Sequence, residues 1–370
     1  MSLIKILYIL PALNFCGGME NYAMNYYRRI DKNKIQIDFI THTNLELSFK
    51  SEIESLGGKV YQFPVFSIKN FKLIQKNINE FFMVHKNEYS IIHCHMANAA
   101  YFYFKIAKKY GINIRILHSH QPSAADKITH KIRNYPLLYL GNKLATHRVA
   151  CTELAGNFLF KKKSFITIRN AIDVNRFSFN LSKRIELRKK LDIENKFVIG
   201  HIGRFCAQKN QKFLLEIFKE VLKKNKNAYL ILIGDGEDKQ KIKEYIKFLN
   251  LMNKVKIIPP CENVNDYYQA FDAFVFPSLY EGLGIVLIEA QCAGLMVYTS
   301  NENIPKDVKL TSNLEFISLK ETANIWANDI LNNTNYIRKN HYEEIKKSGY
   351  DIDNEVKILE SYYLSLVNKS

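Results

Sequence analysis

The sequence of 370 residues lacks features that would define several classes of protein. Its six cysteines are far apart and form no Cys-x-x-Cys pair, which argues against a disulfide framework or structural zinc site and favours a reducing cytoplasm. No stretch approaches the ~20 apolar residues of a membrane-spanning helix, and residues 1–10 have no cleavage-like tail, so we expect neither a span nor a signal peptide. Repeats and low-complexity segments are also missing.

Acidic residues are scarce in the first half of the chain. Residues 1–175 contain 24 Lys and Arg against 11 Asp and Glu, so most of the net charge of +17 lies there. The basic clusters alternate with Phe, Tyr and Leu, which suits anionic lipid headgroups, although a solvated lysine-rich face is the alternative. Nucleic acid is not expected, since zinc-finger, RRM and helix-turn-helix patterns are absent. We therefore expect a cytoplasmic protein held peripherally at the inner face of the membrane. The clusters are Lys105, Lys108 and Lys109; Lys127, Lys131 and Arg133; and Lys161, Lys162 and Lys163.

Apolar runs of strand length alternate with longer amphipathic stretches, and this happens twice along the chain. Such alternation predicts two parallel sheets covered by helices, in domains 1–175 and 176–352. Residues 175–195 are polar and are expected to connect the domains, whereas 353–370 reads as a helix that can cross back to the first domain. The expected strands are 4–10, 35–41, 59–63, 90–95, 113–119 and 148–152, then 197–203, 228–234, 255–259, 273–277 and 296–300.

The most informative segment is 278–294, Ser-Leu-Tyr-Glu-Gly-Leu-Gly-Ile-Val-Leu-Ile-Glu-Ala-Gln-Cys-Ala-Gly. Its glycine turn presents the backbone amides of 283–285 at the positive end of a helix dipole, which suits a diphosphate. Glu281 lies just before the helix and Glu289 about two turns along it, so both carboxylates can accept hydrogen bonds from hydroxyl groups. Together they fit a sugar nucleotide. The alternative is an ordinary strand-turn-helix with Glu281 as a cap and Glu289 in solvent.

Other candidate residues also follow expected strands, where ligands gather in parallel sheets. Gly17 and Gly18 form a turn that opens a helix and lets a ligand approach the backbone, although a Gly-Gly pair is also common in plain turns. Gly203 ends an expected strand and is followed by Arg204 and Lys209, so these two cations can point at one place at the edge of the sheet. The alternative is that both are solvated charges of a loop. Gly234 ends the next strand and is expected to border the nucleotide.

Four histidines end two neighbouring strands of the first half. Alternation along a strand places His93 with His95, and His118 with His120, on one face. Four imidazoles are able to hold a metal ion. No carboxylate lies at ligand spacing nearby, however, and hydrogen-bonded histidines are commoner, so we expect no metal and no cofactor.

These motifs, in this order, resemble the retaining glycosyltransferases of family four. The resemblance rests on five motifs. They are Gly-Gly-Met-Glu; Asn-Ala-Ile-Asp; Gly-Arg-Phe followed by Gln-Lys-Asn; Gly-Asp-Gly; and Pro-Ser-Leu-Tyr-Glu-Gly, whose glutamate is followed eight residues later by a second glutamate. It covers residues 1 to about 300. The tail around 300–319 is similar to bacterial transferases of capsule and exopolysaccharide assembly.

The resemblance implies the GT-B architecture, in which two Rossmann-like doubly wound α/β domains face each other across a cleft. It also implies a metal-independent hexosyltransferase that moves a sugar from a nucleotide-sugar donor, such as a UDP-hexose or UDP-N-acetylhexosamine, to a lipid-linked or oligosaccharide acceptor. Carried over by position, Glu289 would bind the ribose and Glu281 the sugar, while Arg204 and Lys209 would hold the diphosphate.

The remaining roles also come from the resemblance. His120 corresponds to a cleft histidine near the sugar, and Gly17 with Gly18 would border the phosphates from the opposite side. In the second domain, donor contacts are expected from Gly203, Gly234, Gly282, Leu283, Gly284 and Ile285.

Three positions depart from the family pattern. Ala171 replaces the glycine of Asn-Gly-Ile-Asp, Pro259 stands where a glycine often follows the third strand, and Met296 replaces a proline. A sugar-nucleotide epimerase and an inactive scaffold of a polysaccharide-assembly complex stay open as alternatives, because the same fold serves both.

Overall fold

The computed structural model describes residues 3–15, 17–43, 45–46, 48–67, 69–124 and 128–368. Lys127, named above, lies outside these residues. The chain divides into two compact units. Unit 1 is Met1–Asn170 with Ile352–Ser370, and unit 2 is Ala171–Asp351, so the chain leaves unit 1 five residues before the predicted boundary.

Unit 1 contains a parallel sheet of seven strands in the order β3-β2-β1-β4-β5-β6-β7. Strand β1 lies between β2 and β4, so the order reverses there, and this reversal is the switch point at which α/β sheets bind ligands. The strands are β1 (Ile4–Leu10), β2 (Ile35–Thr41), β3 (Val60–Gln62), β4 (Ile91–Cys94), β5 (Ile114–Ser119), β6 (His147–Ala150) and β7 (Ile166–Thr167).

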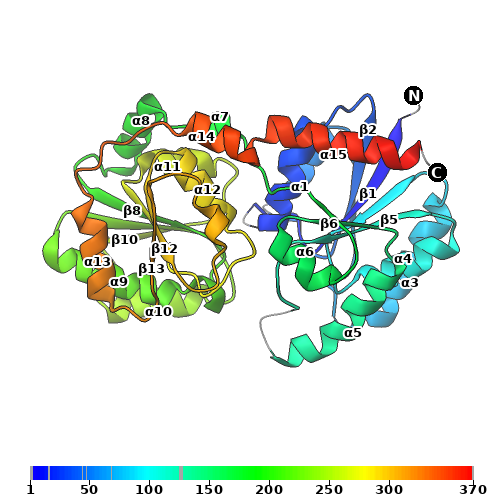
Figure 1. Ribbon diagram of the computed structural model, residues 1–370. Helices are drawn as coiled ribbons and strands as arrows, with labels where there is room; N and C mark the ends of the chain where they lie inside the picture. Colours follow the sequence, from blue (N-terminus) through cyan, green and yellow to red (C-terminus); the bar gives the residue numbers. More distant parts are fainter. Residues whose placement is uncertain are drawn as a thin grey trace. The chain divides into compact units, whose positions relative to one another are not determined.

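Helices lie on both faces of this sheet (Figure 1). The apolar faces of α3 and α4 pack with the inward side chains of β1, β4 and β5 in one core cluster. The helices are α1 (Gly18–Arg29), α2 (Lys50–Ser55), α3 (Phe71–His85), α4 (Ala100–Lys109), α5 (Ile128–Leu144), α6 (Glu153–Phe160) and α15 (Ile352–Val367).

Unit 2 repeats the arrangement with six parallel strands in the order β10-β9-β8-β11-β12-β13. Its switch point lies between β8 and β11. Two separate clusters of buried side chains cover the two faces of the sheet, as burial of both faces requires. The strands are β8 (Phe197–Ile202), β9 (Ala228–Ile233), β10 (Val255–Ile258), β11 (Ala273–Phe276), β12 (Met296–Ser300) and β13 (Leu314–Ile317).

The helical segments of unit 2 include the stretch that we expected to be a connection. Residues 175–195 form most of α7 and all of α8, and α8 packs on α11. The segments are α7 (Val174–Phe177), α8 (Leu181–Leu191), η1 (Ala207–Lys209), α9 (Gln211–Lys224), α10 (Lys239–Phe248), α11 (Val264–Ala270), α12 (Ile285–Cys292), η2 (Lys306–Val308), α13 (Ala323–Asn332), α14 (Tyr342–Ile345) and η3 (Lys346–Tyr350).

The last helix, α15, follows unit 2 in the sequence but belongs to unit 1, where it packs on α1 (Figure 1). Val356, Leu359 and Tyr363 are buried on one side of it. The Tyr363 hydroxyl lies 2.6 Å from the Tyr8 hydroxyl of β1 and 2.6 Å from Nδ1 of His93. These polar contacts tie the end of the chain to the centre of the first sheet.

Candidate active site

The turn between β11 and α12 has the shape that the sequence predicted. Gly284 caps α12 with φ of 80°, a left-handed conformation that favours glycine, and Gly282 and Gly284 are both half-buried. Ile285 opens the helix, so its amide has no acceptor within the helix. Leu283 is buried. The turn stands at the carboxyl end of β11, beside the switch point of unit 2.

Glu281 and Lys209 form an ion pair that the sequence did not predict. The Lys209 ammonium lies 2.6 Å from Oε1 of Glu281, and the hydroxyl of Ser278 donates to the same oxygen. The lysine also lies 4.9 Å from the centre of the Phe276 ring. Glu281 is only 7% exposed, so its carboxylate is fixed by two donors at the end of β11.

Glu289 points into the interior of unit 2 rather than into solvent. It is 6% exposed, and its Oε2 accepts a hydrogen bond of 2.7 Å from the hydroxyl of Tyr268 on α11. Burial raises the pKa of Glu289 to about 7, against smaller lowering effects of the Tyr268 hydrogen bond and Arg176. Sequence reasoning missed Tyr268, because nothing in the spacing shows which side chain reaches Glu289.

Arg204 behaves differently from Lys209. Its side chain is 66% exposed and pairs with Glu237 at 3.0 Å, so the two cations have separate carboxylate partners. Arg204 therefore stands on the surface loop after β8, whereas Lys209 is half-buried against the site glutamate.

Gly234, after β9, has a structural reason to be glycine that is independent of any ligand. A Cβ at Gly234 would lie 2.0 Å from the carbonyl oxygen of Gly203, so the two loops approach more closely than side chains allow. The amide of Phe205 donates to the carbonyl of Asp235 at 2.8 Å and joins the same loops. At Gly203 itself, a Cβ would make only ordinary contacts with Lys209.

Gly17 and Gly18 begin α1 after β1, at the switch point of unit 1. The Glu20 carboxylate folds back over Gly17, and a Cβ there would lie 1.7 Å from Oε2 of Glu20. A Cβ at Gly18 would meet nothing within 4 Å. A larger residue at position 17 would only require the Glu20 carboxylate to move, and open space in front of the backbone remains at Gly18.

The four histidines of unit 1 form two hydrogen-bonded pairs stacked on each other. Nε2 of His93 lies 3.1 Å from Nδ1 of His118, and Nδ1 of His95 lies 2.8 Å from Nε2 of His120. The His118 and His120 rings stack with centres 4.0 Å apart. Burial lowers the pKa of all four, for His120 to about 3, so they are neutral imidazoles.

A metal ion fits this cluster poorly. Ring nitrogens of His93, His95 and His118 all lie within 4.8 Å of one another. Both nitrogens of His93 are already hydrogen-bonded, and imidazole lone pairs lie in the ring planes, so nearly parallel rings do not direct them at one point. We therefore interpret the cluster as a hydrogen-bonded core that holds half-buried His120 in place.

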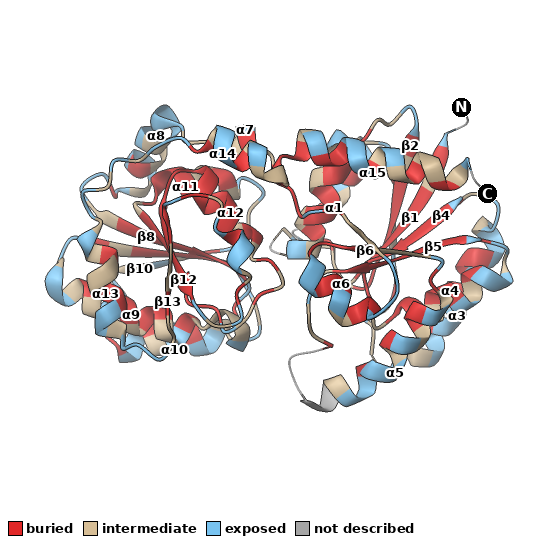
Figure 2. Cartoon of the chain, in the orientation of Figure 1, coloured by how far each residue is buried: buried red, intermediate tan, exposed pale blue. Residues whose placement is uncertain are grey.

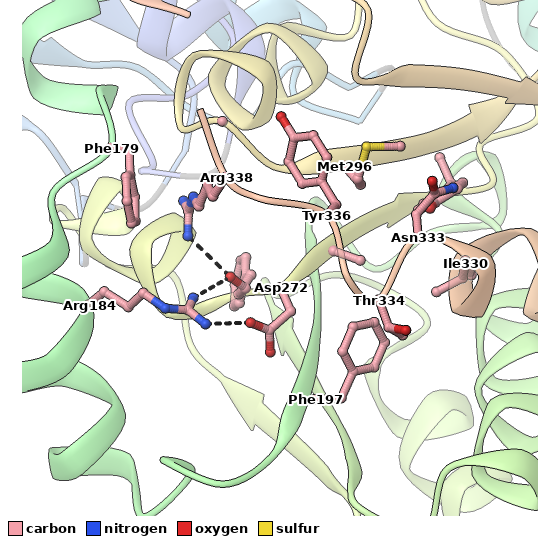
Figure 3. Close-up of a pocket in the computed structure, with 14 residues that line it drawn as sticks. Phe179, Arg184, Phe197, Asp272, Met296, Ile330, Asn333, Thr334, Tyr336 and Arg338 are labelled. Atoms are coloured by element: carbon pink, nitrogen blue, oxygen red, sulfur yellow. Dashed lines mark hydrogen bonds and ion pairs between the residues drawn. The ribbon is translucent and has the colours of Figure 1, made fainter. Parts of the chain in front are cut away.

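A pocket in unit 2 lies at the opposite ends of the strands, and its lining contains none of the predicted site residues. Figure 3 shows Arg184 and Arg338 directed toward Asp272 and the backbone beside it. Arg184 bonds the carbonyls of Gln269 and Phe271 and pairs with Asp272, and Arg338 bonds four carbonyls. These cations are satisfied within the protein, so they anchor α8 and the segment after α13 to the sheet.

Comparison with known proteins places the chain in a family. Residues 16–176 match the model described as Glycosyltransferase Family 4, and residues 183–310 match Glycosyl transferases group 1. "Putative glycosyltransferase EpsF" of Bacillus subtilis (strain 168) is 32% identical over 97% of this chain and 96% of its own. "Capsular polysaccharide biosynthesis glycosyltransferase CapH" of Staphylococcus aureus is 25% identical over 98% of this chain and 99% of its own.

Two further similarities concern donors and acceptors of other proteins. "UDP-Gal:alpha-D-GlcNAc-diphosphoundecaprenol alpha-1,3-galactosyltransferase" of Escherichia coli is 24% identical over 82% of this chain and 80% of its own. The crystal structure of HepE from Anabaena in complex with UDP-glucose superposes with a TM-score of 0.80, at 19% identity, over 98% and 99% of the two chains. That protein has the same fold. Given the full-length similarity to EpsF and the two matching family models, the chain belongs to the GT-B glycosyltransferases.

Proposed function

We propose that this glycosyltransferase moves a hexose or N-acetylhexosamine, with retention of configuration, from a UDP-sugar to a lipid-linked or saccharide acceptor in surface polysaccharide synthesis. The observation that carries the proposal is the arrangement of Lys209, Glu281 and Glu289 around the turn into α12, at the switch point of unit 2. HepE, which shares the fold, was crystallised with UDP-glucose, and this supports a UDP-sugar as the donor class.

The two glutamates would hold different parts of the donor. Glu289 has one oxygen bonded to Tyr268, and its other oxygen is available to accept from a ribose hydroxyl. Glu281 is fixed by Lys209 and Ser278 before α12, whereas Glu289 lies about one turn into that helix, and Glu281 would accept from hydroxyls of the transferred sugar.

Departure of the UDP group builds negative charge on the diphosphate, and the chain has cations and amides to stabilise it. The Lys209 ammonium has three donors, and its bond to Glu281 leaves others for a phosphate oxygen. The amides at the start of α12 and the positive end of its dipole add to this field. Arg204 would join by exchanging Glu237 for the diphosphate. We therefore propose transfer without a metal ion and assign no protein nucleophile.

Residues of unit 1 would serve the acceptor and the sugar. His120 is neutral and half-buried at the end of β5, and Gly18 has open space before its backbone. Their proposed roles near the sugar and phosphates, with Gly17, rest on the family resemblance. Similarity to the Escherichia coli enzyme, whose name gives a diphosphoundecaprenol-linked acceptor, supports a lipid-linked acceptor here.

Peripheral membrane association follows from the same reasoning. Among the described residues, no helix combines the length and apolar character needed to cross a bilayer. The excess positive charge of residues 1–175 would attract the anionic inner leaflet and bring unit 1 to its acceptor.

The test is a panel of UDP-sugars incubated with purified protein, with and without EDTA, while release of UDP is measured. We expect slow hydrolysis of one UDP-sugar, unaffected by EDTA. Conversion of a UDP-sugar to its epimer without UDP release would support the epimerase alternative, and no reaction with any donor or acceptor would support a scaffold. The comparisons favour neither alternative, because the named relatives are glycosyltransferases.

A further inference from the structure

Helix α5 exposes large apolar side chains that the proposed chemistry does not use. Ile132 is 71% exposed, Tyr135 53% and Tyr139 67%. They lie three and four residues apart, so they share one side of the helix, while Asn134 and Leu138 are buried on the other. Figure 2 shows exposed residues along α5.

The buried side of α5 is firmly held by unit 1. Gly141 lies so close to α4 that a Cβ there would be 3.2 Å from the Cβ of Ala100. The side-chain amide of Asn134 donates to the carbonyl of Ala124 at 2.7 Å, and that of Asn142 to the carbonyl of Leu159. The outward apolar stripe is therefore a fixed surface of a packed helix.

The charge around the stripe identifies the kind of partner. Helix α5 itself carries Lys131, Arg133 and Lys143 and has no Asp or Glu. The surrounding sequence from Tyr89 to Thr152 contains nine Lys or Arg and a single acidic residue, Asp126. Neighbouring α4 adds exposed lysines, which are Lys105, Lys108 and Lys109.

An apolar stripe on a helix whose own charged residues are all cations fits the interface of an anionic bilayer. Tyrosine places its ring at headgroup depth and its hydroxyl in water, and the lysine and arginine ammonium and guanidinium groups meet lipid phosphates. Nucleic acid would use the cations but gain little from an exposed isoleucine.

We propose that α5 is the element that inserts into the membrane interface, with Ile132, Tyr135 and Tyr139 entering the headgroup region and Lys131, Arg133 and Lys143 bound to anionic lipid. The inference rests on the proposed function, because it supplies the way in which unit 1 meets a lipid-linked acceptor. It adds an apolar contribution, which high salt does not remove, to the electrostatic attraction already expected.

Insertion is tested with a tryptophan placed at Tyr135. The natural chain has one tryptophan, Trp326, which is fully buried in unit 2 and so gives a constant background. Vesicles of phosphatidylethanolamine with roughly a quarter phosphatidylglycerol should shift the emission of Tyr135→Trp to shorter wavelength, and brominated lipid should quench it. The matched control is Phe248→Trp on α10 of unit 2, where the native side chain is 76% exposed and no shift is expected.

A variant with Ile132→Ser, Tyr135→Ser and Tyr139→Ser should lose at least tenfold in vesicle affinity at high salt. It should keep the UDP release of the wild type with a UDP-sugar in solution. Vesicle binding without a Tyr135→Trp shift, or a shift given by duplex DNA and not by vesicles, would overturn the inference while leaving the proposed function intact. Loss of UDP release in the wild type would instead refute the proposed function, whatever the vesicles show.

Discussion

Glu289 gives the sharpest quantitative prediction, because burial raises its pKa to about 7 while the proposed role requires the ionised form. The carboxylate accepts hydrogen bonds from ribose hydroxyls, and the protonated acid loses much of that capacity. Affinity for the UDP-sugar should therefore fall as the pH drops through 7. Between about pH 8 and pH 6 the ionised fraction changes about tenfold, which corresponds to ~1.4 kcal/mol of binding free energy.

The raised pKa of Glu289 also affects the stability of the fold: a rise in pH, which should strengthen donor binding, should weaken the fold. Glu289 has a folded pKa of about 7 and an ordinary value of 4.5, so the unfolded chain gives up this proton first. The free energy of unfolding should decrease as pH rises from 4.5 to above 7, by about 3 kcal/mol from this group. Glu289→Gln cannot ionise, so above neutral pH it should be more stable than the wild type while binding the donor more weakly.

Calorimetric titration with the UDP-sugar, and urea unfolding, measure the two effects. A sugar diphosphate diester has no proton to lose near neutral pH, so the ligand itself adds no titration. The Glu289→Gln variant is the control, and its affinity should be independent of pH across this range. A wild-type affinity that is the same at both ends of the range, with unchanged relative stability of Glu289→Gln, would refute the reasoning.

Three other predictions concern separate groups. Arg204→Ala and Lys209→Ala should each lower kcat at least about a hundredfold, since one preorganised charge donor is worth ~3 kcal/mol. Lys209→Ala should also lower the melting temperature, because it leaves buried Glu281 without its cation. Full activity in either variant would exclude a role of that residue in holding the leaving group. Glu281→Ala should leave UDP affinity nearly unchanged and abolish sugar turnover, whereas equal loss of UDP affinity in Glu281→Ala and Glu289→Ala by calorimetry would contradict separate roles. A variant with Lys105→Glu, Lys108→Glu and Lys109→Glu on α4 should bind anionic vesicles at low salt more weakly by orders of magnitude, at ~1 kcal/mol per lysine, without a change in UDP binding. Equal recovery of this variant and the wild type in vesicle flotation would mean that the lysines form only a solvated face.

Most of the strands could be predicted because buried parallel strands have nearly continuous apolar sequences. Ile4–Leu10 and Met296–Ser300 agree with the predicted ranges. The missed strands are the short edge strands β7 and β13, of which β7 has two residues and β13 is partly exposed. Two residues are too few to show a pattern, and the apolar run of β13, Leu-Glu-Phe-Ile, is only four residues long.

The predicted connection was wrong for a different reason. Residues 175–195 are polar because α8 lies on the surface, and its Arg184 and Arg188 reach back to Asp272 at the start of β11. A helix held by ion pairs and carbonyl contacts has a weak apolar pattern, so residues 181–191 show no clear helical periodicity.

At the candidate site, motif spacing predicted the glycine turn and the place of Glu281 before the helix, whereas Glu289 lies about one turn into α12 rather than the expected two. It did not predict the Lys209–Glu281 pair, the Tyr268 bond to Glu289, or the pairing of His95 with His120. These contacts join residues between 21 and 72 positions apart, and they depend on how neighbouring elements pack. The roles of the site residues remain predictions for the experiments above.

The most direct test of the central claim is transfer of labelled sugar from the UDP-sugar selected by the panel to a diphosphoundecaprenol-linked sugar, in the presence of EDTA. We expect labelled lipid product and released UDP in equal amounts, with retained anomeric configuration, and loss of both in Glu281→Ala. A UDP-sugar pool that is epimerised or unchanged, with no labelled product across a panel of lipid-linked and oligosaccharide acceptors, would contradict the account.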